Sequence, residues 1–325
     1  MSSNCGQLFL TGLSGTSLLK EERDFIANEE VAGVVLFSKN YESKKQLITL
    51  ISDIQNCSKD KKIIAVDHEG GRVQRFRSGF SIVPSAREIA EEKSAKKCFE
   101  IYSQIARELN QVGVNLNLAP CSDILTNPNC EVIGDRSFGR DVEVVGKFVS
   151  AAIRGLQKNK VLACAKHFPG HGDTYIDSHN DLPISERSFE LLEKEDIEVF
   201  KIASRNKVSL MMMAHLLVPE LDPDFPASLS KKSHDYLVDN LNFRGIIISD
   251  DMEMGAITKN YGAAESAELA IRAGTHLVEY RSFDACREVV NSLNKKYEED
   301  NTFRTIVDQR KNELDYKLNN IFLSI

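Results

Sequence analysis

The feature that most constrains the fold is an alternation of short apolar runs with longer amphipathic stretches. Eight runs are rich in β-branched and other apolar residues and have the length of buried strands. Between them, apolar residues recur at spacings of three and four, as in helices with one buried face. This alternation predicts a parallel sheet covered by helices. The expected strands are residues 8–11, 34–37, 63–66, 114–118, 161–165, 209–213, 245–248 and 275–278.

Eight strand–helix units are the number that a single (β/α)8 barrel of the TIM type requires. A doubly wound open sheet is the alternative, because the units alone do not force closure. The polar strand ends favour the barrel, since a barrel brings the carboxyl end of every strand to one face. The expected helices are residues 19–28, 45–56, 86–112, 142–159, 189–205, 231–241, 263–273 and 283–293.

The length of the chain suits one large barrel domain. The chain has 325 residues, within the range of (β/α)8 barrels that carry additions. Beyond residue 295 the sequence is charged and then regains helical spacing at Phe303, Val307 and Leu314. We therefore expect one catalytic domain over residues 1–325, in which residues 296–325 form an extra C-terminal helix packed on the barrel.

Composition indicates a globular protein that binds neither nucleic acid nor a membrane. Hydrophobic residues make up 42% of the chain and charged residues 27%, which suits a packed core with a charged surface. A net charge of −7 without a basic block argues against nucleic acid and anionic membranes, because both attract clustered Lys and Arg. The seven cysteines are scattered, and the N-terminal stretch lacks the segments of an export signal. We expect a cytoplasmic protein with reduced thiols, and a monomer.

Polar side chains follow four of the expected strands. Because a barrel delivers the carboxyl end of each strand to the same face, these side chains should meet at one mouth. Histidines are prominent among them, and a site that works near neutral pH has use for histidine. The segments are Asp67-His-Glu after the third strand, Lys166-His167 after the fifth, Ala214-His215 after the sixth and Ser249-Asp-Asp after the seventh.

The seventh expected strand ends in two adjacent carboxylates, Asp250 and Asp251. Successive side chains of a strand point in opposite directions, so only one of the two should face the mouth. A carboxylate at the end of an apolar strand costs too much to bury without a partner, which favours a functional role for one. We assign Asp250 to the site and a supporting role to Asp251. A helix cap for the following segment is the structural alternative.

The stretch of residues 166–183 concentrates ionisable groups directly after the fifth expected strand. Its glycines and prolines indicate a loop at a strand end, where catalytic residues often lie. Within it, Asp177 and His179 are two residues apart, a spacing at which a carboxylate can orient an imidazole and raise its basicity. Such a pair could exchange a proton near pH 7. The alternative is a turn in which Asp177 caps backbone N–H groups and His179 is exposed.

The same loop offers the ligands of a metal site. His167, His171, Asp173 and His179 carry imidazole and carboxylate groups, which suit zinc. Barrel metallohydrolases usually bring a His-x-His from the first strand, whereas the first strand here ends in Thr11-Gly. We therefore expect no metal and no other cofactor.

Arginines accompany the carboxylates of the expected mouth. The segment Asp67-His-Glu-Gly-Gly-Arg-Val-Gln-Arg75 joins a strand-end carboxylate to a glycine turn and two arginines. Arg136 adds another on the long loop after the fourth strand. Paired acidic and basic groups suit a polyhydroxylated ligand, which offers hydrogen-bond donors and acceptors at each carbon. A salt-bridged turn is the structural alternative.

Taken together, these segments resemble glycoside hydrolase family 3. Within that family the chain is most similar to the single-domain bacterial β-N-acetylglucosaminidases, or β-hexosaminidases, of peptidoglycan recycling. The family fold is a (β/α)8 barrel, in agreement with the strand pattern. The segments that carry the resemblance are Asp67-His-Glu-Gly-Gly-Arg-Val-Gln-Arg75, Arg136-Ser-Phe-Gly, Lys166-His-Phe-Pro-Gly-His-Gly, Asp177-Ser-His179, Met213-Ala-His215 and Ser249-Asp-Asp-Met.

The resemblance implies a role for each matching residue. It makes Asp250 the catalytic nucleophile, and Asp177 with His179 the acid/base dyad, in which His179 replaces the carboxylic acid that most retaining glycosidases use. The chain departs from the family in the eighth strand, where relatives often have Asp and this chain has His276. The residues expected around the terminal sugar are Asp67, Arg75, Arg136, Lys166, His167 and His215.

The activity that the resemblance implies is exo-hydrolysis of a terminal β-linked N-acetylglucosamine from muropeptides, with retention, through a covalent glycosyl-enzyme. Two alternatives remain. A phosphorylase is one, because a histidine acid/base does not repel an incoming phosphate as a carboxylate would. The other is a sugar-binding sensor that has lost catalysis, although nucleophile, dyad and sugar-contacting residues are all present in the sequence.

Overall fold

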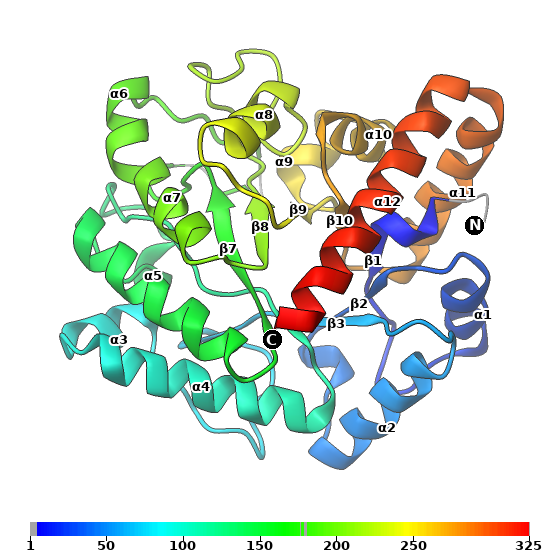
Figure 1. The fold of residues 1–325 in the computed structure, drawn as a ribbon, viewed down its shortest axis with the longest axis horizontal. Coiled ribbons are helices and arrows are strands. Elements are labelled where there is room, and N and C mark those ends of the chain that lie inside the picture. The colour runs from blue at the N-terminus through cyan, green and yellow to red at the C-terminus, as the bar shows by residue number, and fades with distance from the viewer. Residues whose placement is uncertain (1–4, 176, 179–180, 325) are drawn as a thin grey trace.

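The computed structural model describes residues 5–175, 177–178 and 181–324, and it is a closed barrel of parallel strands inside a ring of helices (Figure 1). The barrel closes because β1 pairs on both sides, with Leu10 opposite Gly33 of β2 and Phe9 opposite Val278 of β10. The predicted (β/α)8 fold is therefore confirmed. The barrel strands are β1 (Phe9–Thr11), β2 (Gly33–Leu36), β3 (Ile63–Val66), β6 (Leu116–Asn117), β7 (Leu162–Phe168), β8 (Leu210–Met213), β9 (Ile246–Asp251) and β10 (Leu277–Tyr280).

The side chains of each barrel strand alternate between two apolar layers. In β8, Leu210 and Met212 belong to one buried cluster, and Met211 and Met213 belong to the other. Met212 also lines the cleft at the barrel mouth, so its layer is the barrel interior and the other layer packs beneath the helices. The strand sequences are apolar at successive positions because both of their faces are buried.

The helices follow the predicted amphipathic stretches, and serine and aspartate side chains cap several of them. Ser43, Ser94, Asp141 and Ser230 each accept a hydrogen bond from a backbone N–H in the first turn of a helix. The helices around the barrel are α1 (Lys20–Asn28), α2 (Lys44–Gln55), α3 (Ala86–Glu91), α4 (Ala95–Val112), α5 (Val142–Gln157), α6 (Phe189–Leu192), α7 (Glu198–Arg205), α8 (Lys231–Asp239), α10 (Ala263–Ala273) and α11 (Phe283–Glu299).

Two predicted helices differ in detail from the structure. The stretch 86–112 is broken into α3 and α4, because Lys93 has a positive φ of 54° and Ser94 caps a new helix. The stretch 189–205 is continuous, but a π-helical segment η4 (Glu193–Ile197) joins α6 to α7. The helical spacing of apolar residues identifies the buried face in both cases, but it does not reveal a local break or a π-helical turn.

Several short elements outside the barrel strands and the longer helices were not predicted. They are the hairpin of β4 (His68–Gly70) with β5 (Val73–Gln74), the helix α9 (Gly255–Thr258) and the 3₁₀ turns η1 (Gly6–Leu8), η2 (Ser38–Asn40) and η3 (Gly134–Arg136). Each is too short to show a hydrophobic period in the sequence. The hairpin and η3 carry residues of the cleft described below.

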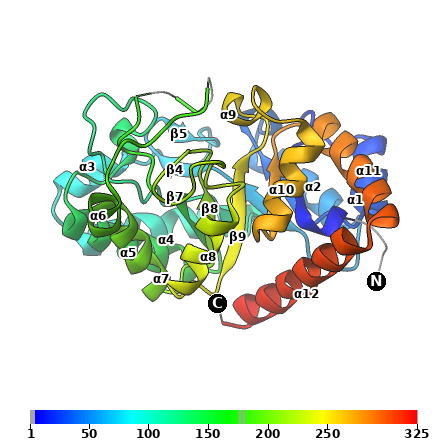
Figure 2. The same cartoon turned by 90° about the horizontal axis from the view of Figure 1, so that it is seen from above.

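The last helix, α12 (Asn301–Ser324), lies across the end of the barrel opposite the mouth (Figure 2). Lys317 Nζ donates to the backbone carbonyls of Arg244 and Gly245, which directly precede β9. His276 lies at this same end, with Nδ1 accepting from Ile247 N and Nε2 3.4 Å from the Glu313 carboxylate of α12. The departure from the family at His276 is therefore remote from the cleft. No helix within the described ranges is both long and apolar enough to cross a bilayer.

We predict that α12 contributes to the stability of the barrel. Phe303 is fully buried and packs in the same cluster as the barrel interior, so Phe303→Ala should lower the free energy of unfolding by about 3–5 kcal/mol. Tyr316 on the same helix is 71% exposed, and Tyr316→Ala should change the free energy of unfolding by no more than about 0.5 kcal/mol. Urea denaturation of both variants measures the difference. Equal effects would mean that α12 is attached to the barrel only loosely.

Candidate active site

A cleft of about 670 Å³ opens at the carboxyl ends of the barrel strands. Most of the residues predicted for the site border it, although they come from elements spread along the chain. His215 is different, since it is buried behind Asp251 and is not among the described residues that line the cleft. The predicted residues at the cleft are Asp67, Arg75, Arg136, Lys166, His167, Asp177 and Asp250.

Lys166, near the end of β7, is the centre of a buried ion-pair network. Its Nζ lies 2.6 Å from Asp67 Oδ1 and 2.7 Å from Glu69 Oε1, and the side chain is 3% exposed. Burial alone would raise the pKa of Asp67, but Lys166 and Arg75 hold it well below its usual value. Burial likewise opposes ionisation of Glu69, yet Arg136 and Lys166 lower its pKa to about 2. Both carboxylates are therefore ionised at neutral pH.

Two arginines complete this network from either side. Arg75 donates to Asp67 Oδ2 at 3.0 Å. Arg136 makes two parallel hydrogen bonds to Glu69, from Nε at 2.9 Å and from Nη2 at 2.8 Å. Such bidentate pairs fix the guanidinium plane as well as its position. Arg136 Nη2 also lies 3.3 Å from His167 Nε2, so the network reaches the imidazole at the cleft.

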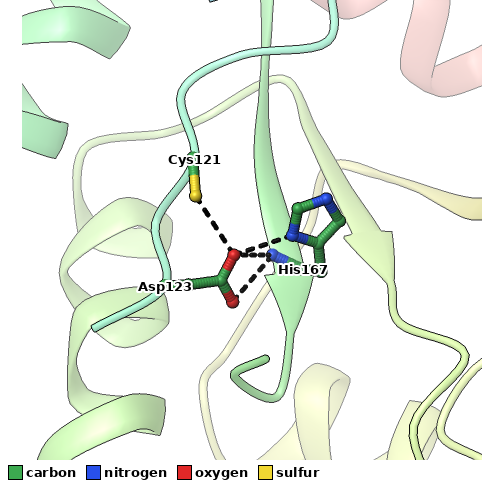
Figure 3. Close-up of side chains that lie close together, drawn as sticks. All are labelled: Cys121, Asp123 and His167. Atoms are coloured by element: carbon green, nitrogen blue, oxygen red, sulfur yellow. Dashed lines mark hydrogen bonds and ion pairs between the residues drawn. The ribbon is translucent and has the colours of Figure 1, made fainter. Parts of the chain in front are cut away.

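Asp123 holds the histidines of the β7 loop from beneath the cleft. Its Oδ2 is 2.7 Å from His167 Nδ1, and the backbone N–H groups of His167 and His171 donate to it as well. Cys121 Sγ is 3.2 Å from the same oxygen (Figure 3). Burial would raise the pKa of Asp123, but its contact with His167 keeps it lowered. The result is an ionised acceptor that orients His167 toward the cleft.

The grouping of Cys121, Asp123 and His167 is also the set of side chains in the described ranges that is close enough to share a metal ion. Their contacts are better explained as hydrogen bonds. Burial raises the pKa of the Cys121 thiol well above its usual value, so the sulfur is a donor rather than the thiolate that a metal needs. Asp123 meanwhile accepts from two backbone N–H groups, which leaves it few free lone pairs.

His171 and Asp173, two residues of the zinc site considered from the sequence, likewise make hydrogen bonds to neighbouring side chains. His171 has both ring nitrogens in contact with hydroxyl groups, Nδ1 with Thr174 at 2.9 Å and Nε2 with Ser178 at 3.0 Å. Burial lowers the pKa of His171 to about 4, so this ring is neutral at physiological pH. Asp173 accepts from Thr126. His179, the fourth residue of that set, lies outside the described residues.

The two aspartates that end β9 have different environments. Burial opposes the charge on Asp250, but His167, His215 and Lys166, together with a hydrogen bond from the Asp251 N–H, lower its pKa. Burial raises the pKa of Asp251 to about 7. Environments that separate the pKa values of two neighbouring carboxyl groups allow them different roles. Of these two aspartates, Asp250 is thus the one whose surroundings favour the ionised form.

Asp251 is engaged in local structure even though part of it reaches the cleft. Its Oδ1 accepts from the backbone N–H groups of Glu253 and Arg281, and its backbone carbonyl accepts from His215 Nε2 at 3.0 Å. His215 in turn contacts Ser228 through Nδ1. These contacts fit the supporting role predicted for Asp251, and they place His215 next to the strand end rather than in the cleft lining.

The loop after β7 brings Asp177 to the cleft. Its neighbour Ser178 contacts the His171 ring and accepts from the backbone N–H of Ala256 in α9. Gly172 allows the loop to approach the chain after β6 closely, because a Cβ there would lie 1.7 Å from the carbonyl oxygen of Ile124. The partner predicted for Asp177 is His179, which falls outside the described part of the chain.

The structure also reveals site residues that the sequence analysis did not assign. Glu69 belongs to the segment from Asp67 to Arg75 but was given no role, and it forms ion pairs with both Lys166 and Arg136. Asp123 lies in a loop without a recognisable spacing. Glu279 directly follows the eighth predicted strand, so the rule that selects polar residues at strand ends could have identified it.

Comparisons with known proteins agree with this geometry. The model of the glycosyl hydrolase family 3 N terminal domain matches residues 3–306. A beta-hexosaminidase of Hydrogenovibrio crunogenus is 38% identical over 276 residues, which cover 83% of this chain and 77% of that protein. A beta-hexosaminidase of Nitrosomonas eutropha is 37% identical over 303 residues, covering 90% of this chain and 86% of that protein.

Solved structures show the same fold. The family 3 β-N-acetylglucosaminidase of Paenibacillus superposes with a TM-score of 0.92 at 31% identity over 98% of this chain, which spans 62% of that longer protein. NagZ from Neisseria gonorrhoeae in complex with N-trifluoroacetyl-D-glucosamine has a TM-score of 0.81 at 29% identity, covering 96% of this chain and 98% of that one. Family model, relatives and fold together show that this chain belongs to glycoside hydrolase family 3 and is a β-hexosaminidase-like glycoside hydrolase.

Proposed function

We propose that this protein is a retaining exo-β-N-acetylglucosaminidase that removes a terminal β-linked N-acetylglucosamine from peptidoglycan fragments. The observation that carries the proposal is Asp250, a buried carboxylate at the cleft whose pKa is lowered by the neighbouring His167 and His215 in spite of its burial. A retaining glycosidase needs an ionised carboxylate at this place to act as nucleophile. The similarity to beta-hexosaminidases and to a sugar-bound NagZ supports N-acetylglucosamine as the terminal sugar.

In the first step Asp250 attacks C1 of the terminal sugar, and the bond between C1 and the leaving oxygen breaks. A covalent glycosyl-enzyme results. The leaving oxygen takes a proton from His179, which Asp177 would keep in its charged form. Asp177 borders the cleft, and Ser178 ties this part of the loop to His171 and α9, which supports a dyad on the open side of the cleft.

In the second step His179 removes a proton from water, and the resulting hydroxide attacks C1 and releases Asp250. Protonation and deprotonation by one group in the two half-reactions follow from microscopic reversibility. No step requires a metal or another cofactor. The sugar with retained β configuration leaves the cleft, and the enzyme returns to its starting protonation state.

The ion-pair network holds the sugar in this scheme. Lys166, Arg136 and His167 present donors to sugar hydroxyl groups, while Asp67 accepts from them. Because each cation is already fixed by a carboxylate beneath it, the groups need little rearrangement when a sugar binds. We further propose that the substrates are cytoplasmic muropeptides, by similarity to the bacterial enzymes of peptidoglycan recycling.

Hydrolysis of an aryl N-acetyl-β-glucosaminide tests the proposal directly. We expect release of the aryl alcohol, with the β anomer of N-acetylglucosamine appearing first in proton NMR spectra, because two inversions at C1 restore its configuration. The same reaction in phosphate buffer should give free sugar. Sugar 1-phosphate would instead identify a phosphorylase, and absence of any turnover would favour a sugar-binding sensor.

Replacement of the nucleophile should abolish turnover without loss of the fold. Asp250→Ala is expected to lower kcat by about 10³- to 10⁶-fold, because it removes the group proposed to form the covalent bond. Asp251→Ala is the matched control, and it should lower thermal stability through loss of its backbone contacts while kcat falls much less. Steady-state kinetics with circular dichroism compare the two. A folded Asp251→Ala variant with the larger loss of kcat would transfer the nucleophile to Asp251.

Removal of His179 should affect substrates according to their leaving groups. His179→Ala is expected to slow natural disaccharides about 10²- to 10⁴-fold more than aryl glycosides with acidic leaving groups, which need little protonation. Asp177→Asn should reproduce part of this pattern, since the imidazole loses the carboxylate that stabilises its charged form. A plot of log kcat/KM against leaving-group pKa measures the slope. An unchanged slope would assign the acid role to another group, such as His171 or Asp173.

A further inference from the structure

Glu279 is a buried carboxyl group at the cleft that the mechanism above does not use. It lies in β10, and alternation along this strand directs it into the barrel mouth, because the next residue, Tyr280, reaches outward to donate to the Ala263 carbonyl in the helix layer. Only 4% of Glu279 is exposed, and it lines the same cleft as Asp250 and Lys166.

The backbone of Glu279 is satisfied while its carboxyl group is not. Its N–H donates to Ser249 Oγ and its carbonyl accepts from the Met252 N–H. The side-chain oxygen Oε2 is buried and has no hydrogen-bond partner among the residues that the structure describes. A buried polar atom without a partner is uncommon in folded proteins and costs stability. Its presence at the cleft therefore indicates that a bound ligand supplies the hydrogen-bond partner.

The charges around Glu279 decide which form of the carboxyl group is present. Three ionisable acids act on it, Asp67 directly after β3 and Asp250 and Asp251 of the neighbouring strand β9, and Lys166 of β7 is the opposing cation. Lys166 is already paired with two carboxylates. Burial and the three aspartates raise the pKa of Glu279 well above its usual value. These surroundings favour the neutral form of the Glu279 carboxyl group, which carries an O–H donor.

We propose that Glu279 is a specificity residue of the cleft, whose carboxyl group forms a hydrogen bond with a hydroxyl group of the bound terminal sugar. This inference rests on the proposed glycosidase function and deepens it. A neutral carboxyl group can donate its O–H and accept through its other oxygen, which matches a sugar hydroxyl that does both. The bound sugar thus supplies the partner that the free protein lacks at this position.

Two substitutions separate this role from a structural one. Glu279→Gln keeps a neutral group of the same shape with a donor and an acceptor, whereas Glu279→Leu keeps much of the volume and removes both. The substrates are an aryl N-acetyl-β-glucosaminide and its 3-deoxy, 4-deoxy and 6-deoxy analogues, each lacking one hydroxyl. Wild type and both variants are compared by kcat/KM on all four, and by thermal unfolding.

We expect Glu279→Leu to lower kcat/KM on the parent substrate by at least about fivefold, because a buried sugar hydroxyl loses its partner. On one deoxy analogue this loss should disappear, which identifies the hydroxyl that Glu279 contacts. Glu279→Gln should stay within about threefold of the wild type on the parent and keep its discrimination. The melting temperature of Glu279→Leu should equal or exceed that of the wild type, since an unpartnered polar group is removed.

Equal losses on all four substrates, or no loss on the parent, would overturn the proposal, and a lowered melting temperature with uniform losses would show a structural role instead. If Glu279→Leu does not fold, Glu279→Gln decides, because uniform losses in that variant contradict a sugar contact. Wild-type turnover of the parent substrate is measured in the same series. Its absence would refute the glycosidase function itself, an outcome distinct from failure of the Glu279 inference.

Discussion

The arrangement of the cleft depends on one buried cation, Lys166, held between the carboxylates of Asp67 and Glu69. An ammonium group this deeply buried is stable only because both partners are ionised and within hydrogen-bond distance. The two carboxylates are in turn fixed by Arg75 and Arg136. Removal of Lys166 would leave both carboxylates without the cation between them, and breaking a buried ion pair typically costs about 3–5 kcal/mol. The network is therefore a structural element as well as the surface that we propose to face the sugar.

Charge balance explains why acids so close together have different protonation states. Asp67, Glu69 and Asp250 have lowered pKa values and share the cations of Lys166, Arg75 and Arg136. Burial raises the pKa of Asp251 although Arg281 lies 3.5 Å from its carboxylate, and burial together with the neighbouring acids raises the pKa of Glu279. Acids with lowered and with raised pKa values thus occur side by side, which allows them different roles within one small volume.

The fold was largely predictable from the sequence. All eight barrel strands were identified within a few residues, because strands buried on both faces are unbroken apolar runs with turn residues around them. The break at Lys93 and Ser94, the β4–β5 hairpin and α9 were missed. Local backbone conformation determines these features, and they are too short to carry a hydrophobic period.

The candidate site was predictable where a residue ends a strand, as with Asp67, Lys166 and Asp250. Asp123 could not be found in this way, because its importance lies in contacts with backbone N–H groups 44 and 48 residues along the chain, which only the folded barrel creates. His215 shows the converse. It lies just beyond the end of β8, yet its ring contacts Ser228 and the Asp251 backbone, since packing sets the direction of a side chain beyond a strand end.

The cleft is assembled from both halves of the barrel, and the loop between α5 and β7 divides its components. Asp67, Arg75 and Arg136 precede this loop, whereas Lys166 and Asp250 follow it. Neither half contains both the proposed nucleophile, Asp250, and the carboxylates that hold Lys166 in place. A chain cut in this loop would consequently have no activity in either fragment, and recovery of activity on mixing would report that the two halves had rejoined.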